Sequence, residues 1–298
     1  MSSANLHPTA QVFFVNVGHR GVKDTAGGAV MRDTRSGESM RPELFTILGI
    51  DVQSYGVSKA AAALVAAWLL GRAFERQGLK KESAHALVLW ATLWGFVGAK
   101  IYYLLEQYPA ITVHDLGGMG FTWYGGLVGG VIAALVVIRR HQLPVDTVAG
   151  AVAIPLTVAY GIGRLGCFVS GDGTYGRPTD LPWGMAFPSG VVATDVPVHP
   201  TPLYEAILAA VAAAVLVVLV RRWAPLAVFG AYLGLSGLSR FLVEFLRTND
   251  PVILGLTQPQ LWALVSIAVG IVLIVRSGTH QRSADHVVPE PGVSQPVR

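Results

Sequence analysis

Seven apolar stretches constrain this chain more than any other feature. Each has about the length that a helix needs to cross a bilayer, roughly 17 to 25 residues. A spanning segment must satisfy its backbone hydrogen bonds internally, and a helix does so. The sequence therefore predicts an all-α membrane protein with seven transmembrane helices. The stretches are Val57–Phe74, Ala84–Leu105, Phe121–Ile138, Val145–Leu165, Leu203–Val220, Leu226–Phe245 and Gln260–Val275.

Composition agrees with a membrane protein and argues against several other classes. Of the 298 residues, 52% are hydrophobic and 13% are charged, whereas soluble domains have about 25% charged residues. The net charge of +4 could suggest nucleic acid, but the basic residues stand singly or in pairs at the ends of apolar stretches. That placement is typical of membrane anchoring, and we expect no nucleic-acid partner. The single cysteine, Cys167, excludes an intrachain disulfide.

Positive charge at the ends of the stretches predicts an orientation, because cytoplasmic loops are enriched in lysine and arginine. Basic residues follow the first, third, fifth and seventh stretches, which places these connections in the cytoplasm. The amino terminus is then outside, the carboxyl terminus inside, and residues 166–202 face the periplasm or cell exterior. The basic residues are Arg72, Arg76, Lys80, Lys81, Arg139, Arg140, Arg221, Arg222 and Arg276.

The two ends of the chain differ in composition from the part between them. Residues 1–39 hold no apolar run long enough for a span or a signal peptide. We interpret them as a disordered segment or a mis-annotated extension, with Met31 or Met40 as the true initiator. Residues 40–277 would form the seven-helix domain. Residues 278–298 are polar and proline-rich, which predicts a disordered cytoplasmic tail.

Charged residues inside the apolar stretches are the first candidates for a functional site. A charge at a helix centre costs about 2.5 to 3.5 kcal/mol on insertion scales, so each one needs a reason. Arg240, Glu244 and Arg247 are spaced to share one face of a helix. Together with Arg164, they could hold a phosphate diester, with Glu244 orienting an arginine. The alternative is an internal salt bridge that only stabilises the bundle.

Closely spaced glycines from Gly161 to Pro178 predict that the backbone leaves the fourth helix there. Such irregular backbone would line a cavity on the periplasmic side, with Gly163, Arg164 and Asp172 at the substrate. The alternative is a flexible loop, which would leave the arginine unexplained.

A second cluster of polar residues begins the fifth stretch, in the heptapeptide HPTPLYE from His199 to Glu205. His199 is a candidate base, and Tyr204 and Glu205 are candidate substrate-binding residues. Tyr55 and Tyr124 could belong to the site or to the ordinary aromatic belt at the membrane surface. The sequence has no nucleotide-binding loop and no metal-ligand spacing, so we expect neither a cofactor nor a metal.

Long motifs in chain order carry a family resemblance. They are GRLGCF (Gly163–Phe168), YGRPT (Tyr175–Thr179), PWGMAFP (Pro182–Pro188), HPTPLYE (His199–Glu205) and SRFLVEFLR (Ser239–Arg247). From about Met40 to Arg276 the chain resembles the bacterial phosphatidylglycerol–prolipoprotein diacylglyceryl transferases.

The resemblance implies a transferase of the bacterial cytoplasmic (inner) membrane whose active site opens to the periplasmic side. Such an enzyme takes phosphatidylglycerol from the membrane lipid and transfers its diacylglyceryl group to the lipobox cysteine of a prolipoprotein signal peptide. This thioether-forming protein modification is the first step of lipoprotein maturation. Arg164 and Arg240 match two arginines that are essential in the family, and Tyr55 and Glu244 match a family tyrosine and acid.

Four positions depart from the family pattern. Tyr124 stands where well-known members have a histidine, and Cys167 replaces an asparagine. Asp172 replaces a glutamate, and Lys100 replaces a typical arginine. The base for the acceptor thiol is therefore open among Tyr55, Tyr124 and His199, and histidine is the side chain that exchanges a proton closest to neutral pH. The departures also leave two alternatives: a related transferase with another acceptor, or a lipid-binding or transport protein without catalysis.

Overall fold

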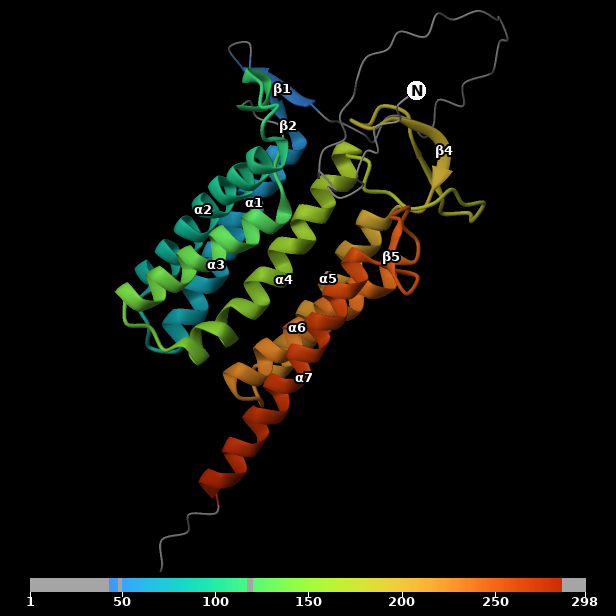
Figure 1. The fold of residues 1–298 in the computed structure, drawn as a ribbon. Coiled ribbons are helices and arrows are strands. Elements are labelled where there is room, and N and C mark those ends of the chain that lie inside the picture. Colours follow the sequence, from blue (N-terminus) through green and yellow to red (C-terminus); the bar gives the residue numbers. More distant parts are fainter. Residues whose placement is uncertain (1–42, 48–49, 117–119, 286–298) are drawn as a thin grey trace, which may run out of the picture.

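Seven long helices dominate the structure, a computed structural model that describes residues 43–47, 50–116 and 120–285 (Figure 1). All seven are long and apolar enough to cross a membrane, which agrees with the prediction of an all-α membrane protein. They are α1 (Ser54–Arg76), α2 (Lys81–Gln107), α3 (Trp123–Arg140), α4 (Val145–Ser170), α5 (Thr201–Leu219), α6 (Pro225–Glu244) and α7 (Gln258–Asp285). Each contains most or all of one predicted stretch.

Three two-stranded antiparallel sheets lie outside the helices, all toward one end of the bundle (Figure 1). Each precedes an odd-numbered helix, so the sheets lie at the end where α1, α5 and α7 begin. A short 3-10 helix, Val113–Leu116, lies between α2 and α3. The strands are β1 (Glu43–Ile47), β2 (Ile50–Gln53), β3 (Met185–Phe187), β4 (Thr194–Val198), β5 (Pro251–Ile253) and β6 (Leu256–Thr257).

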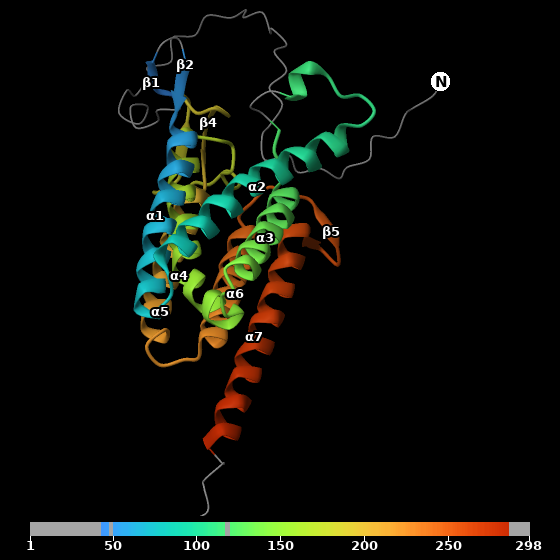
Figure 2. The same cartoon turned by 90° about the vertical axis from the view of Figure 1, so that its left-hand side faces the viewer.

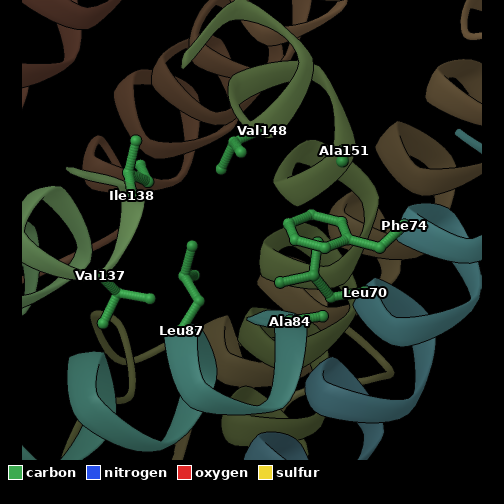
Figure 3. Packing of buried hydrophobic residues seen from close by; sticks show 8 residues of the cluster. All are labelled: Leu70, Phe74, Ala84, Leu87, Val137, Ile138, Val148 and Ala151. Carbon is green, nitrogen blue, oxygen red and sulfur yellow. The ribbon is translucent and has the colours of Figure 1, made fainter. Parts of the chain in front are cut away.

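Helix α4 occupies the middle of the bundle (Figures 1 and 2). It packs against α1 on one side and against α5 and α6 on the other, while α2 packs on α3 and α6 on α7. At the end away from the sheets, Leu70, Phe74 and Leu87 pack with Val137 and Val148 in a hydrophobic core (Figure 3). This core ties α1, α2, α3 and α4 together.

Large apolar side chains cover the outside of the helices. Leu64 is 72% exposed and Trp68 is 50% exposed, and similar residues follow the outer faces of the other helices. A soluble protein rarely exposes so much contiguous apolar surface. In a bilayer these side chains contact lipid tails.

Helices α2 and α3 approach each other through glycines. A methyl group on Gly125 would collide with the carbonyl of Gly98 and the side chain of Tyr102. A methyl group on Gly234, inside α6, would meet no atom within 4 Å. Small residues at such contacts let helix backbones pack closely within a membrane.

Replacing Gly125 with alanine is expected to destabilise the protein by about 1 to 3 kcal/mol, because the added methyl overpacks this contact. The matched change Gly234→Ala should leave stability unchanged or raise it by up to about 1 kcal/mol, because alanine is the better helix former. Thermal unfolding of both variants in the same detergent measures the difference. Equal effects of the two changes would contradict the packing argument.

Two boundaries differ from the sequence predictions. The glycines Gly161, Gly163 and Gly166 do not break α4, which stays helical to Ser170 and ends at Gly171, whose φ is 60°. They instead serve close packing, since a Cβ on Gly166 would overlap the Ser58 side chain of α1. The predicted irregular segment therefore begins about two turns later than expected.

Helix α7 also continues beyond residue 277, through Asp285. The predicted tail begins at residue 278, so its first residues continue α7; an established helix extends at little cost where neither proline nor a cap stops it. The predictions for residues 1–39, the choice of initiator and residues 286–298 lie outside the described residues.

Candidate active site

Among the described residues, the buried charges gather in one cluster, and Glu205 of α5 lies at its centre. Its side chain is 0% exposed, which is costly for an unpaired carboxylate. Oε2 lies 3.1 Å from Nε of Arg164 on α4, and Oε1 lies 3.0 Å from Nη1 of Arg240 on α6. Arg247 Nη1 lies 3.7 Å from Oε2, and the Tyr160 hydroxyl donates to Oε1 at 2.8 Å.

A second buried carboxylate, Glu244, ends α6 and is 2% exposed. Its Oε2 lies 2.9 Å from Nη2 of Arg240 and 3.9 Å from Nε of Arg247. Its Oε1 accepts hydrogen bonds from the Asn249 amide and, at 3.0 Å, from the Thr257 hydroxyl. Glu244 therefore fixes both arginines and ties the end of α6 to the segment that enters α7.

Arg247 reaches the cluster in a way that the sequence did not predict. It was expected on the helix face of Arg240 and Glu244, but α6 ends at Glu244. The residues Thr248 to Pro251 disfavour a helix. A tight turn, in which the Arg247 amide donates to the Glu244 carbonyl at 3.1 Å, returns the side chain to the same carboxylates.

The cluster has one more positive charge than negative charge, because three guanidinium groups share two carboxylates. The Nη1 atoms of Arg164 and Arg247 are buried and form no hydrogen bond among the described residues, and the same holds for Oε2 of Glu205 and of Glu244. Burial, followed by the nearby charge of Arg240, lowers the pKa of Arg247 from its ordinary value. Both features favour an anion that accepts hydrogen bonds from these two nitrogen atoms.

A second polar group lies where α4 packs against α1. The Lys59 Nζ lies 4.8 Å from the centre of the Tyr55 ring, and a Cβ on Gly163 would lie 3.1 Å from that nitrogen. Lys59 interacts electrostatically with Cys167, Arg164 and Asp172. Arg164 therefore stands between this group and the cluster around Glu205.

The loop after α4 is held in place by Tyr175. Its hydroxyl donates to the carbonyl oxygens of Gly171, at 2.7 Å, and Val192, and its ring stacks on Phe187 with centroids 4.2 Å apart. Burial raises the pKa of Tyr175 to about 12, so the hydroxyl stays a neutral donor. Asp172, in the same loop, accepts hydrogen bonds from the backbone and side chain of Thr174 at 3.1 and 2.6 Å.

Two of the candidate bases lie outside the charge cluster. Tyr124 of α3 packs among aromatic rings, including those of Tyr102 and Trp262 at 6.5 and 6.2 Å between centroids. His199 Nδ1 lies 3.3 Å from the hydroxyl of Tyr204. Among the described residues neither forms a hydrogen bond or ion pair with Glu205, and the charge of Arg240 acts on Tyr124. These contacts do not select one of the two as the base.

An apolar groove of about 340 Å³ lies between α5 and α6. It contains Tyr204, Leu208, Leu242 and Leu246 among its lining residues. Elsewhere in the described residues, no three histidine, cysteine, aspartate or glutamate side chains gather as metal ligands would.

Sequence reasoning missed Tyr160 and Lys59. Tyr160 is one helical turn before Arg164, a spacing that places both on one side of α4. Lys59 is a cation among alanines in the first apolar stretch, and its cost in a membrane would have marked it as a candidate.

Comparison with known proteins gives a consistent result. A family model described as prolipoprotein diacylglyceryl transferase matches residues 42–276. Three similar proteins carry the name phosphatidylglycerol–prolipoprotein diacylglyceryl transferase. The one from Clostridium tetani is 30% identical over 78% of this chain and 96% of its own length. The one from Geobacter sulfurreducens is 34% identical over 70% of this chain and 83% of its own length. The one from Idiomarina loihiensis is 32% identical over 79% of this chain and 92% of its own length.

Proposed function

We propose, because this chain belongs to the prolipoprotein diacylglyceryl transferase family, that it transfers the diacylglyceryl group of phosphatidylglycerol to the lipobox cysteine of prolipoproteins. One observation carries the proposal for this chain: the cluster around Glu205 has a single excess positive charge and two buried Nη1 atoms that form no hydrogen bond among the described residues. The phosphodiester of phosphatidylglycerol carries a single negative charge and accepts hydrogen bonds.

The reaction is a displacement at carbon. The acceptor sulfur forms a bond to the glycerol carbon that bears the phosphate, and the carbon–oxygen bond breaks. The bonding electrons stay on the phosphate oxygen, which leaves as glycerol phosphate. The proton lost by the thiol balances the proton taken up by that phosphate or by water. Catalysis therefore needs a cation at the phosphate and an ionised thiol.

Arg164 and Arg240 take the phosphate role in this proposal, and Glu244 orients Arg240 through its 2.9 Å ion pair. Arg247 adds a further donor, and Glu205 holds the three guanidinium groups together against their mutual repulsion. The apolar groove beside Tyr204 offers a surface for an acyl chain. Tyr55, Tyr124 and His199 stay candidates for accepting the thiol proton, and Gly163 and Asp172 for contacting substrate.

The proposed orientation puts this site at the periplasmic side of the bacterial cytoplasmic membrane. The site lies where α4 and α6 end and α5 begins. The basic connections after α1, α3 and α5 lie at the opposite end, which supports a cytoplasmic location for that end. The catalytic domain would span residues 40–277, with the amino terminus outside and the carboxyl terminus inside.

Mass spectrometry of a lipobox peptide incubated with the purified protein and phosphatidylglycerol tests the function. We expect a diacylglyceryl mass increment on the peptide cysteine. Tyr124, Cys167 and Asp172, which depart from the family pattern, favour a related transferase as the second candidate. Turnover of phosphatidylglycerol without peptide modification would support another acceptor, and lipid binding without turnover would support a non-catalytic protein.

A further inference from the structure

Lys59 is a half-buried cation that the proposed phosphate clamp does not use. It lies in α1, inside a membrane span. Among the described residues it takes part in no salt bridge. An intramembrane charge is costly and usually has a function.

Lys59 and the phosphate clamp approach α4 from different helices. Gly161 and Tyr160 face α5, since a Cβ on Gly161 would lie 3.3 Å from Ala209 Cβ and Tyr160 donates to Glu205. Gly163 and Gly166 contact α1, where they meet Lys59 and Ser58. Arg164 therefore has a positive charge from α1 near it as well as the arginines of the cluster.

Gly163 makes the position of Lys59 possible. Its missing side chain leaves space for the ammonium group, which lies 3.1 Å from where a Cβ would be. Cys167 follows one turn later, and Arg164, Asp172 and the Tyr55 ring also interact with Lys59. Asp172 accepts hydrogen bonds from Thr174, and no carboxylate of the described residues forms an ion pair with the lysine.

A displacement at carbon has negative charge at two positions, the incoming sulfur and the leaving phosphate oxygen. The sulfur must approach the glycerol carbon from the side opposite the leaving phosphate oxygen, so two anionic groups lie on opposite sides of one carbon. One cationic cluster can hold the phosphate, but it cannot also stabilise the sulfur on the far side. A second cation placed across from the first would meet the incoming thiolate.

We propose that Lys59, beside Tyr55 and Gly163, stabilises the thiolate of the acceptor cysteine while the arginine cluster holds the phosphate. This inference rests on the proposed transferase function and deepens it. It assigns a substrate-contacting role to a residue outside the motifs that carry the family resemblance. The charge of Lys59, and not a proton transfer by it, is the property that matters.

Lys59→Met and Lys59→Arg separate charge from shape. An opposite charge within about 4 to 6 Å shifts the ionisation of a group by at least about one pH unit. We therefore expect Lys59→Met to lower kcat/KM for a lipobox peptide about tenfold below pH 8 and to move the pH profile upward. The KM for phosphatidylglycerol should not change. Lys59→Arg should restore most of the activity.

A peptide with selenocysteine in place of the lipobox cysteine provides the decisive readout, because a selenol is already ionised at neutral pH. We expect Lys59→Met to modify this peptide at nearly the wild-type rate. Both variants are purified in full length and compared with wild type by thermal unfolding, so that a folding defect is recognised.

Three results would overturn the inference: full activity of Lys59→Met on the cysteine peptide, an equal loss on both peptides, or a loss that appears only in the KM for phosphatidylglycerol. The same experiment distinguishes a failure of the Lys59 role from a failure of the proposed transferase function. If the wild-type protein modifies neither peptide, the transferase function fails. If the wild-type protein modifies both peptides and Lys59→Met modifies them equally well, only the role of Lys59 fails.

Discussion

Replacing Arg164 with alanine is expected to lower kcat for thioether formation by about 100- to 1,000-fold, the usual loss when one donor to a developing anion is removed. Arg164 is 7% exposed and contributes a buried Nη1 atom that has no partner among the described residues. The variant should still fold, because Glu205 keeps its ion pairs with Arg240 and Arg247. Diacylglyceryl transfer to a lipobox peptide, followed by mass spectrometry, measures the effect.

Arg139→Ala is the matched control for Arg164→Ala. Arg139 is exposed in the last turn of α3, at the end of the bundle away from the cluster, so its loss should change transfer less than about twofold. A lysine at position 164 keeps the charge but loses the planar fork, and should restore activity only in part. An Arg164→Ala protein with wild-type activity would exclude the phosphate clamp.

Replacing Glu205 with glutamine is expected to lower the free energy of unfolding by about 3 to 5 kcal/mol, because it leaves buried guanidinium groups without their shared carboxylate. Glu205 is 0% exposed and pairs with arginines from α4 and α6 and from the turn after α6. Glutamine has nearly the same shape as glutamate, so the loss of unfolding free energy measures the effect of the charge and not of packing. Thermal or denaturant unfolding in detergent micelles measures it.

The exposed pair between Glu75 and Lys81, with atoms 3.5 Å apart and side chains about half exposed, supplies the control. Glu75→Gln should change stability by less than about 1 kcal/mol, as surface pairs usually do. Should Glu205→Gln prove as stable as Glu75→Gln, the arginines would have to be stabilised by something other than Glu205.

The helices could be predicted from sequence because the bilayer imposes one simple requirement on each of them. A span needs a long apolar run, and all seven runs became helices. The ends were less predictable, since they depend on local caps. Gly163 and Gly166 resemble helix breakers in isolation, yet they are needed where α1 packs against α4, and only the neighbouring helix reveals that purpose.

The candidate site was predictable in its members but not in its arrangement. The cost of burying charge identified Arg164, Arg240 and Glu244 in the sequence. Their mutual contacts run through Glu205, which sits at the start of a different helix and was expected to bind substrate directly. Sequence spacing describes neighbours on one helix, whereas the three arginines come from two helices and a turn. Lys59 was missed although the cost of a cation in the first apolar stretch marks it in the sequence.

A structure of the protein with bound phosphatidylglycerol tests the central claim most directly. The account predicts phosphate oxygens at about 3 Å from Nη1 of Arg164 and of Arg247, the ordinary hydrogen-bond distance. The glycerol carbon would then lie between the arginine cluster and Lys59. A headgroup bound elsewhere, with the arginines still paired only to Glu205 and Glu244, would contradict it.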